Sequence, residues 1–358
     1  MRLERRRAPA SDGSVLELLH LRIPASAHVE LRIDERFAEI GIATSGRLID
    51  LRATTARWGA SVGHLPEELL ASSLPGTVGF CPTNFGWQRG AFLVDGGQLV
   101  TVREDRSLGG QFLVIGRERA GWTAHTIDLA HGAPARSVDE ERLRGLAVGL
   151  EVPAIVRAGR PVARREWVVH PRLLADLRNV FDFACGRGIE LDPELWVELR
   201  HALPESASSA LELERGGGCR EVRALREPAR LRRLIAEAGL DHVAITAAGE
   251  ASEIVFRGPL PPTRLPLVGV GVTAGGALDV TVADGRRRDC PGATIDELAR
   301  CMAERGVIVG GLGSAGGDVA VLERTAAGSE LRNAPSTIDP ASRRPTTRRV
   351  PALLLVAP

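Results

Sequence analysis

The stretch Val307-Ile308-Val309-Gly310-Gly311-Leu312-Gly313-Ser314-Ala315-Gly316-Gly317-Asp318 decides the fold prediction for this chain. It reads as a short apolar strand that runs into a glycine-rich loop, and a second apolar run follows at residues 319–322. Glycine accepts positive φ, so the backbone N–H groups of such a loop can approach a ligand closely. The sequence therefore predicts a sheet that presents the loop 310–318 to a ligand.

Local patterns on either side predict the remaining elements of this sheet. The turn Asp95-Gly96-Gly97 between two apolar runs is typical of a β-hairpin. Thr294, with Glu297 three residues later, forms a capping box that predicts a helix over residues 295–305. A last apolar run at 350–356 predicts the closing strand. The predicted class is α+β, with a mixed, mostly antiparallel sheet core, packed helices and a helical insertion.

The middle of the chain differs in character from its two ends. Residues 171–180, 193–202 and 228–238 show helical spacing of apolar side chains, and proline stands at plausible first-turn positions. The sequence thus predicts an N-terminal extension at 1–24, a main domain formed by 25–170 and 255–358, and a helical insertion at 171–254. Three roles stay open for the insertion: a lid over the site, a contact that makes a homodimer, or neither.

Composition limits the classes of function. The 358 residues carry a formal net charge of +1, which gives no electrostatic case for a nucleic-acid or membrane partner. The chain contains no lysine and no tyrosine, so a Schiff-base lysine, a P-loop lysine and a catalytic tyrosine are excluded. Every basic side chain apart from histidine is arginine, which favours bidentate recognition of an anion. We expect a small-molecule substrate.

The cysteine and histidine patterns point to neither a disulfide framework nor a metal site. The five cysteines are scattered and form no Cys-x-x-Cys pair, and the eight histidines show no ligand spacing. No metal and no cofactor are therefore expected. The N-terminus lacks the apolar segment of a signal peptide, and no window is long and apolar enough for a membrane span. We expect a reducing, cytoplasmic location.

The order of several short motifs resembles that of a known family. A strand ends in Asp284-Gly285-Arg286, the helix and glycine-rich stretch with Ser314 follow, and then come Asn333-Ala334-Pro335-Ser336 and a terminal strand. Upstream, residues 80–85 resemble a strand and loop of the same family. In this order and spacing the chain resembles the phosphodiester glycosidases. The resemblance implies a hydrolase that acts on the glycosidic bond of a sugar phosphodiester of the N-acetylglucosamine-1-phosphodiester kind.

The resemblance also implies roles for individual residues. Asp284 or Asp318 would act as the acid/base, because a glycosidase needs a carboxyl group to protonate the leaving oxygen or to stabilise the anomeric centre. Ser314 and the loop N–H groups would bind an oxygen, and cationic side chains would hold the phosphate. The residues assigned to substrate binding are Asn84, Arg286, Arg264, Gly311, Gly313, Asn333, Ser336, Arg348 and Arg349.

Four departures from the family pattern support a second interpretation. Gly310 stands where the family has Asp, Ala334 where it has Arg, and Ala352 where it has Asn. The Arg-Thr pair of the family falls near Leu267-Val268, and Arg264 is the nearest arginine. The alternative is a catalytically diverged homologue that binds or modifies another small molecule. Such a protein would be a specialised-metabolism enzyme or a carbohydrate- or phosphate-binding module.

Overall fold

The computed structural model describes residues 2–33, 64–82, 93–99, 110–129, 145–162, 164–169, 211–214, 219–220, 242–246, 253–259, 264–338, 345–350 and 352–358. Within these ranges the chain is built mainly from antiparallel strands, and its α-helices are α3 (Pro66–Leu70) and α9 (Ile295–Glu304). The α+β prediction was therefore wrong, because the fold is largely β. The physical reason is that three of the described sheets pack against one another in a shared core, whereas the described helices α9 and α3 each cover one patch of a sheet.

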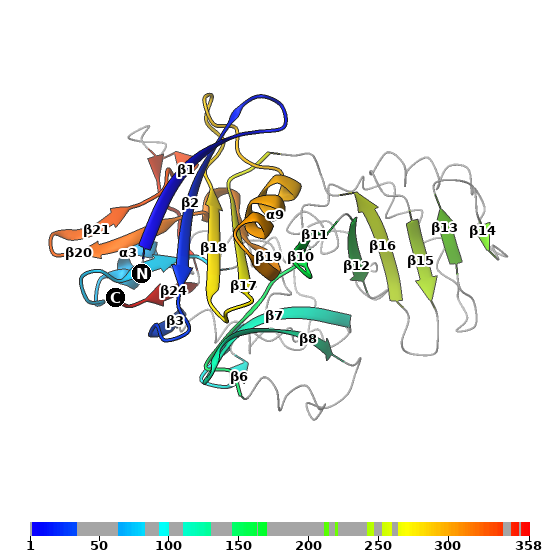
Figure 1. Cartoon of the computed structure of the whole chain (residues 1–358), viewed down its shortest axis with the longest axis horizontal. Coiled ribbons are helices and arrows are strands. Elements are labelled where there is room, and N and C mark those ends of the chain that lie inside the picture. Colours follow the sequence, from blue (N-terminus) through cyan, green and yellow to red (C-terminus); the bar gives the residue numbers. More distant parts are fainter. Residues whose placement is uncertain are drawn as a thin grey trace, which may run out of the picture.

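The strands form four larger sheets and one two-stranded ribbon (Figure 1). The seven-stranded sheet has the order β1 (Arg2–Pro9), β2 (Val15–Ile23), β18 (Leu278–Ala283), β17 (Leu267–Thr273), β19 (Val307–Ala315), β10 (Ala154–Arg157) and β11 (Arg160–Pro161). A five-stranded sheet has the order β21 (Gly328–Leu331), β20 (Val321–Thr325), β4 (Val78–Phe80), β24 (Ala352–Val356) and β3 (Val29–Ile33). Another has the order β6 (Gln98–Leu99), β5 (Leu93–Asp95), β9 (Val148–Glu151), β7 (Gly110–Glu118) and β8 (Gly121–Leu129). The ribbon pairs β22 (Thr337–Ile338) with β23 (Pro345–Thr346).

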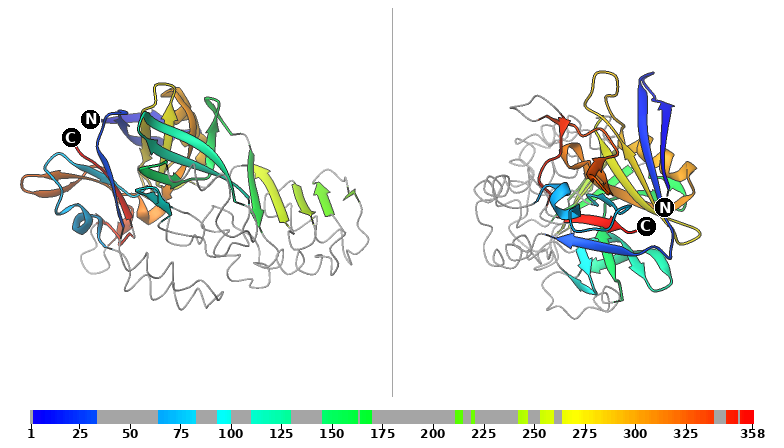
Figure 2. Two further views of the ribbon diagram at one scale, coloured as in Figure 1. Left: turned by 90° about the horizontal axis from the view of Figure 1, so that it is seen from below. Right: turned by 90° about the vertical axis from the view of Figure 1, so that its left-hand side faces the viewer.

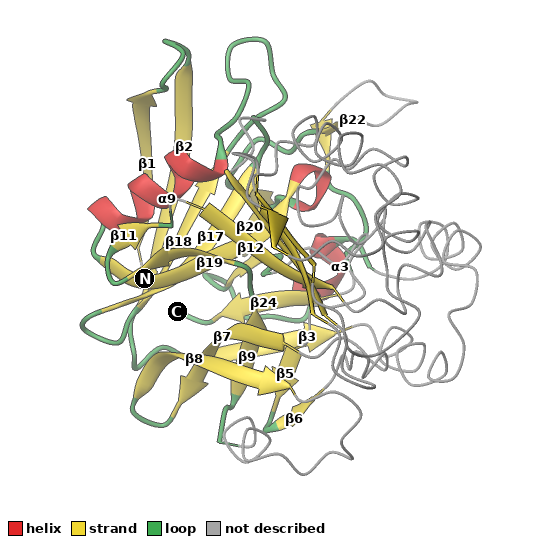
Figure 3. Cartoon of the chain, turned by 90° about the vertical axis from the view of Figure 1, so that its right-hand side faces the viewer, coloured by secondary structure: helices red, strands yellow, loops and turns green. Residues whose placement is uncertain are grey.

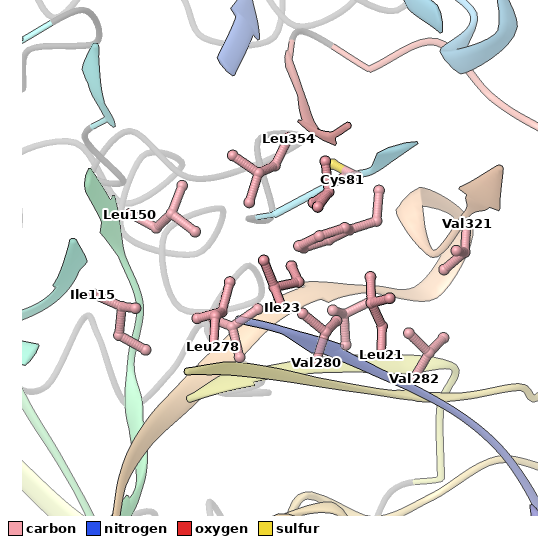
Figure 4. Close-up of a cluster of buried hydrophobic side chains, with 14 of the residues drawn as sticks. Leu21, Ile23, Cys81, Ile115, Leu150, Leu278, Val280, Val282, Val321 and Leu354 are labelled. Atoms are coloured by element: carbon pink, nitrogen blue, oxygen red, sulfur yellow. The ribbon is translucent and has the colours of Figure 1, made fainter. Parts of the chain in front are cut away.

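The main core lies where these three larger sheets meet. Strands β2, β17 and β18 turn alternate apolar side chains towards β4, β20 and β24 and towards β5, β7 and β9. Figure 4 shows side chains from all three sheets meeting in this core, and Figure 3 shows the layers from the side. Fully buried members include Ile23, Phe80, Ile115, Leu150 and Leu278.

Helix α9 covers the opposite face of the seven-stranded sheet (Figure 3). The capping box predicted for it is present: the Thr294 side chain accepts from the N–H of Glu297, and the Glu297 side chain accepts from the N–H of Thr294. The helix turns Leu298 and Met302 onto strands β17 and β19. The expected hairpin at Gly96 and Gly97 is confirmed as well, with both residues at positive φ between β5 and β6.

The glycine-rich stretch is not the loop that its composition suggested. Residues 307–315 form strand β19, which pairs with both β17 and β10, and the turn is confined to the 3-10 helix η1 (Gly316–Asp318). The glycines are needed for close packing instead. A Cβ at Gly310 would lie 2.7 Å from Met302 Cε, and one at Gly311 would lie 2.3 Å from Val152 Cγ2.

Residues expected to be an N-terminal extension are part of the main sheet. Strand β2 pairs with β18 across more than 250 positions of sequence, and Leu19, Leu21 and Ile23 lie in the main core. The two chain ends lie close together in every view (Figures 1 and 2).

The described part of the expected helical insertion consists of strands. Strands β13 (Leu211–Glu214), β14 (Cys219–Arg220) and β15 (His242–Thr246) join β12 (Arg164–Val169) and β16 (Glu253–Pro259) in a five-stranded sheet of order β12-β16-β15-β13-β14. The three helices expected there lie outside the described residues. Among the described residues, no helix is long and apolar enough to cross a membrane.

A buried polar network joins the C-terminus of α9 to the sheet. Asp279 is fully buried and forms ion pairs with Arg22 at 2.8 Å and with Arg305 at 3.0 Å. Thr281 donates to Asp279 Oδ1 at 3.2 Å, and Thr281 Oγ1 lies 3.2 Å from His20 Nδ1. The other ring nitrogen of His20 is buried without a hydrogen-bond partner. The arrangement favours the neutral ring that carries its proton on Nδ1.

We expect this histidine to make the protein sensitive to mild acid. Burial, together with the charge of Arg305, lowers the pKa of His20 to about 4 against the opposing charges of Asp279 and Glu4. The unfolded chain therefore binds a proton at higher pH than the folded one. Stability is fully present above the ordinary histidine pKa and declines as the pH falls from there to about 4. The expected loss over this window is roughly 3 kcal/mol.

Urea unfolding at a series of pH values measures this decline. The variant His20→Asn should flatten the dependence between pH 6.5 and 4. Equal slopes in wild type and His20→Asn would contradict the assignment.

Candidate functional site

The turn η1 carries a carboxylate that is almost completely buried. Strand β19 ends at Ala315, and Gly316 takes φ +64° so that its N–H reaches the carbonyl of Pro266 at 2.8 Å. Asp318 closes this turn with only 3% of its surface exposed. Burial raises the pKa of Asp318 above its usual range, although the nearby charges of Arg348 and Arg286 oppose the shift. A carboxyl group in this position exchanges a proton more readily near neutral pH than an exposed one.

Two arginines converge on this carboxylate from separate parts of the chain. Arg348 follows β23, and its Nε forms an ion pair with Asp318 Oδ1. Arg286 follows β18, is exposed, and takes φ +57°, a conformation rare for a residue with a side chain. The two arginine side chains pass over Gly316 and Gly317, which have no Cβ to obstruct them. A Cβ at Gly316 would lie 3.1 Å from Arg286 Nη2, and a Cβ at Gly317 would lie 3.0 Å from Arg348 Cδ. We name Asp318, Arg286 and Arg348 the arginine–aspartate cluster.

Asn333 and Asp284 fasten the neighbouring loop. The Asn333 side chain accepts from the N–H of Val321 at 2.6 Å and donates to Asp284 Oδ1 at 3.1 Å. The N–H of Ala334 also donates to Asp284 Oδ1, at 3.0 Å. Burial raises the pKa of Asp284, and the two hydrogen bonds work against that shift. The geometry gives Asp284 and Asn333 a positioning task, because their polar atoms hold the backbone beside η1.

The two serines singled out in the sequence differ in their surroundings. Ser336 donates to the carbonyl of Gly316 at 3.1 Å, which fixes the loop 333–336 to the turn. Ser314 is fully buried in β19, and its hydroxyl has no hydrogen-bond partner. A polar residue missed by the sequence reasoning, Thr337, lies against the turn: a Cβ at Gly317 would be 2.8 Å from its Oγ1. Its position directly after Ser336 was the available signal.

Two of the arginines expected at the site lie elsewhere. Arg264 forms hydrogen bonds of 2.8 Å with both oxygens of Glu297 and an ion pair of 2.7 Å with Asp12, at the start of α9. Arg349 lies 3.6 Å from Glu68 beside α3, and nearly half of its side chain is exposed. Both therefore have structural partners away from the arginine–aspartate cluster. Asn84 lies outside the described residues.

Gly311 and Gly313 serve packing within β19. A Cβ at Gly313 would lie 2.7 Å from the carbonyl oxygen of Pro82, so the strand touches the end of β4 directly. Gly310, at the position where the sequence resemblance leads one to expect an aspartate, faces Met302 of α9. A carboxylate at 310 would enter the apolar space under the helix. Leu267 and Leu312 also pack on the α9 side of the sheet.

Substitution of these glycines should show their packing role. The variant Gly311→Ala is expected to lower the free energy of unfolding by about 1–3 kcal/mol, because the new methyl group meets Val152 and the carbonyl of Pro153. Gly275→Ala is the matched control, since a Cβ there has no atom within 4 Å, and its effect should stay within about 0.5 kcal/mol. Urea unfolding compares them. Equal midpoints would show that Gly311 is free to accept a side chain.

No group of three or more His, Cys, Asp or Glu side chains that could hold a metal ion occurs among the described residues. The chemistry open to the described cluster is that of one buried carboxyl group and two guanidinium groups. Such a set can bind an oxyanion and exchange a proton with it.

Comparison with known proteins gives a likeness of fold. No family model matches the chain, and no curated protein matches it by sequence. The catalytic domain of zebrafish N-acetylglucosamine-1-phosphodiester alpha-N-acetylglucosaminidase, auto-inhibited by its pro-peptide, superposes with a TM-score of 0.50 and 11% identity, over 100% of this chain and 82% of that chain. A Burkholderia pseudomallei protein described as exported matches with a TM-score of 0.41 and 13% sequence identity. The match covers 98% of this chain and 76% of that chain. A hypothetical protein from Synechocystis matches with a TM-score of 0.36 and 11% sequence identity. The match covers 99% of this chain and 62% of that chain.

The zebrafish match supports a distant structural relationship with a glycosidase domain. At 11% identity the likeness concerns the fold alone, so the reaction must be argued from the side chains of this chain.

Proposed function

We propose that this protein is a hydrolase that cleaves the glycosidic bond of a sugar phosphodiester. The observation that carries the proposal is the buried carboxyl group of Asp318, held by Arg348 beside Arg286. A phosphodiester linked to an anomeric carbon needs cationic partners for its phosphate and a proton for its leaving oxygen. The distant likeness to a phosphodiester glycosidase domain is consistent with this chemistry.

In the proposed reaction each member of the cluster has one task. Arg286 and Arg348 bind the phosphate, as guanidinium groups do through paired N–H donors. Asp318 gives its proton to the phosphate oxygen while the bond from that oxygen to the anomeric carbon breaks, and the bonding electrons stay with the oxygen. Water adds to the anomeric carbon and gives a proton to the Asp318 carboxylate, which restores the acid. Asp284 and Asn333 position the loop beside η1.

A second function remains open, because Gly310 replaces the aspartate of the related family and has no room for a side chain. That observation favours a binding module for anionic small molecules that uses Arg286 and Arg348 without catalysis. The thiols of Cys290 and Cys301, which form no disulfide, suit the reducing, cytoplasmic location that we propose alongside either function.

Release of N-acetylglucosamine from a chromogenic or UDP-linked N-acetylglucosamine phosphodiester tests the proposal. We expect turnover by the folded wild-type protein that falls strongly in Arg286→Gln and Arg348→Gln. The absence of turnover by folded wild type, accompanied by binding of the same compound, would overturn the hydrolase and leave the binding module.

A further inference from the structure

The arginine–aspartate cluster has two positive side chains and one negative side chain, and these differ in their burial. The Asp318 side chain is only 4% exposed, whereas the Arg348 side chain that holds it is 39% exposed. Arg286 is exposed as well, and its positive charge also acts on Asp318. Two positive groups thus face outward above one buried negative group, which leaves a surplus positive charge at the surface of the cluster.

The turn beneath leaves the outer sides of the guanidinium groups unobstructed by its own side chains. Gly316 and Gly317 contribute no Cβ where Arg286 and Arg348 pass over them. The hydroxyl groups of Ser336 and Thr337 lie against the same turn. These two neighbours contain no titratable group. The other carboxyl group near the turn is that of Asp284, which is bound to Asn333 and Ala334.

We propose that an oxyanion bound by Arg286 and Arg348 drives the protonation of Asp318, so that binding of the ligand itself produces the acid form of this carboxyl group. This inference rests on the proposed function only in that both use the same two arginines. It adds a coupling between ligand binding and proton uptake.

The physical reason is a competition for the two positive charges. In the free protein, Arg348 and Arg286 favour the ionised form of a carboxyl group whose burial already raises its pKa. A bound anion neutralises part of the guanidinium charge, draws N–H donors outward, and adds a negative charge above Asp318. The guanidinium charges then stabilise the ionised Asp318 less, and the buried carboxylate takes up a proton. By linkage, protonated Asp318 must bind the anion more tightly than ionised Asp318.

Inorganic sulfate is the suitable probe, because it does not titrate between pH 4 and 9 and any proton taken up belongs to the protein. Calorimetric titration in two buffers of different ionisation enthalpy measures the protons taken up for each sulfate bound. We expect a net uptake in wild type, and an affinity that rises by up to about tenfold for each unit that the pH falls. In Asp318→Asn we expect no uptake, and an affinity that is tighter and independent of pH.

Two further comparisons keep the test independent of any one variant. Asp284→Asn removes the other carboxylate near the turn and should retain the uptake. The pH dependence of sulfate affinity in wild type requires no substitution. Binding without uptake, or uptake that persists in Asp318→Asn, would overturn the coupling and leave the hydrolase proposal intact. Failure of sulfate to bind to wild type would overturn the coupling, and the hydrolysis assay then decides the proposed function separately.

Discussion

Replacing Asp318 with asparagine is expected to slow hydrolysis of the N-acetylglucosamine phosphodiester by about 10²–10⁴-fold, the usual contribution of a positioned acid. Asparagine keeps the shape of the side chain and a hydrogen-bond acceptor for Arg348, but it cannot supply a proton. The loss should appear in kcat, since the arginines that bind the phosphate remain. The rate in wild type should decline as the pH rises through the raised pKa of Asp318, because only the protonated form acts.

Asp284→Asn and Asp296→Asn are the matched controls for this experiment. Asp284 is bound to Asn333 and Ala334, so its replacement should disturb the loop and change KM more than kcat. Asp296 lies on α9 in an exposed ion pair with Arg300, and its replacement should leave the kinetics unchanged. A larger fall in kcat for Asp284→Asn than for Asp318→Asn would exchange the roles of the two carboxylates.

Replacing Glu297 with alanine is expected to lower the free energy of unfolding by up to about 3–5 kcal/mol, because it removes a nearly buried carboxylate from its ion pair with the partly buried Arg264. Glu297 is 6% exposed and accepts from both terminal nitrogens of Arg264, from the N–H of Thr294, and from the N–H and hydroxyl of Ser11. It therefore joins the β1–β2 turn, the segment before β17 and the first turn of α9.

Chemical unfolding of Glu297→Ala beside Asp296→Ala separates this network from a general effect of acidic residues at a helix N-terminus. Asp296 occupies the same helical turn, and its removal should cost less than about 1 kcal/mol. The network should also fail in acid. Burial of Glu297 opposes its ionisation, but hydrogen bonds led by Arg264 prevail and lower its pKa to about 2. Its contribution is thus present above the ordinary glutamate pKa and is lost as the pH falls towards 2. A small loss of stability in Glu297→Ala would refute the role of this network.

Features that depend on a few neighbouring residues, such as turns and helix caps, could be predicted from the sequence. The hairpin at Gly96 and Gly97 requires only residues that accept positive φ, and the capping box of α9 lies within four residues. The class of the fold could not be predicted, because it depends on which sheet faces meet. That choice is made by the packing of residues such as Leu21 and Phe80, which are far apart in sequence, into one core.

The glycine-rich strand shows how one residue type can mislead. Glycine was taken as a sign of backbone freedom, whereas Gly310 and Gly311 are required because Met302 and Val152 occupy the space of their side chains. The alternation Val268-Gly269-Val270-Gly271-Val272 in the partner strand was a signal of two closely packed layers. The structure brings Asp318, Arg286 and Arg348 together, and their roles in catalysis and substrate binding stay predictions. The structural use of Arg264 could not be foreseen, since its partners Asp12 and Glu297 are distant in sequence.

The pairing of β2 with β18 has a consequence for biosynthesis. Leu19, Leu21 and Ile23 leave the ribosome long before the strand that covers one edge of β2, which begins at Leu278. Because synthesis proceeds at about 5–20 residues per second, roughly 15–50 s pass between the synthesis of β2 and that of its partner β18. During that interval it presents an open strand edge of the kind that chaperones bind and that aggregation exploits. The yield of folded protein should therefore depend on the speed of translation and on chaperone supply.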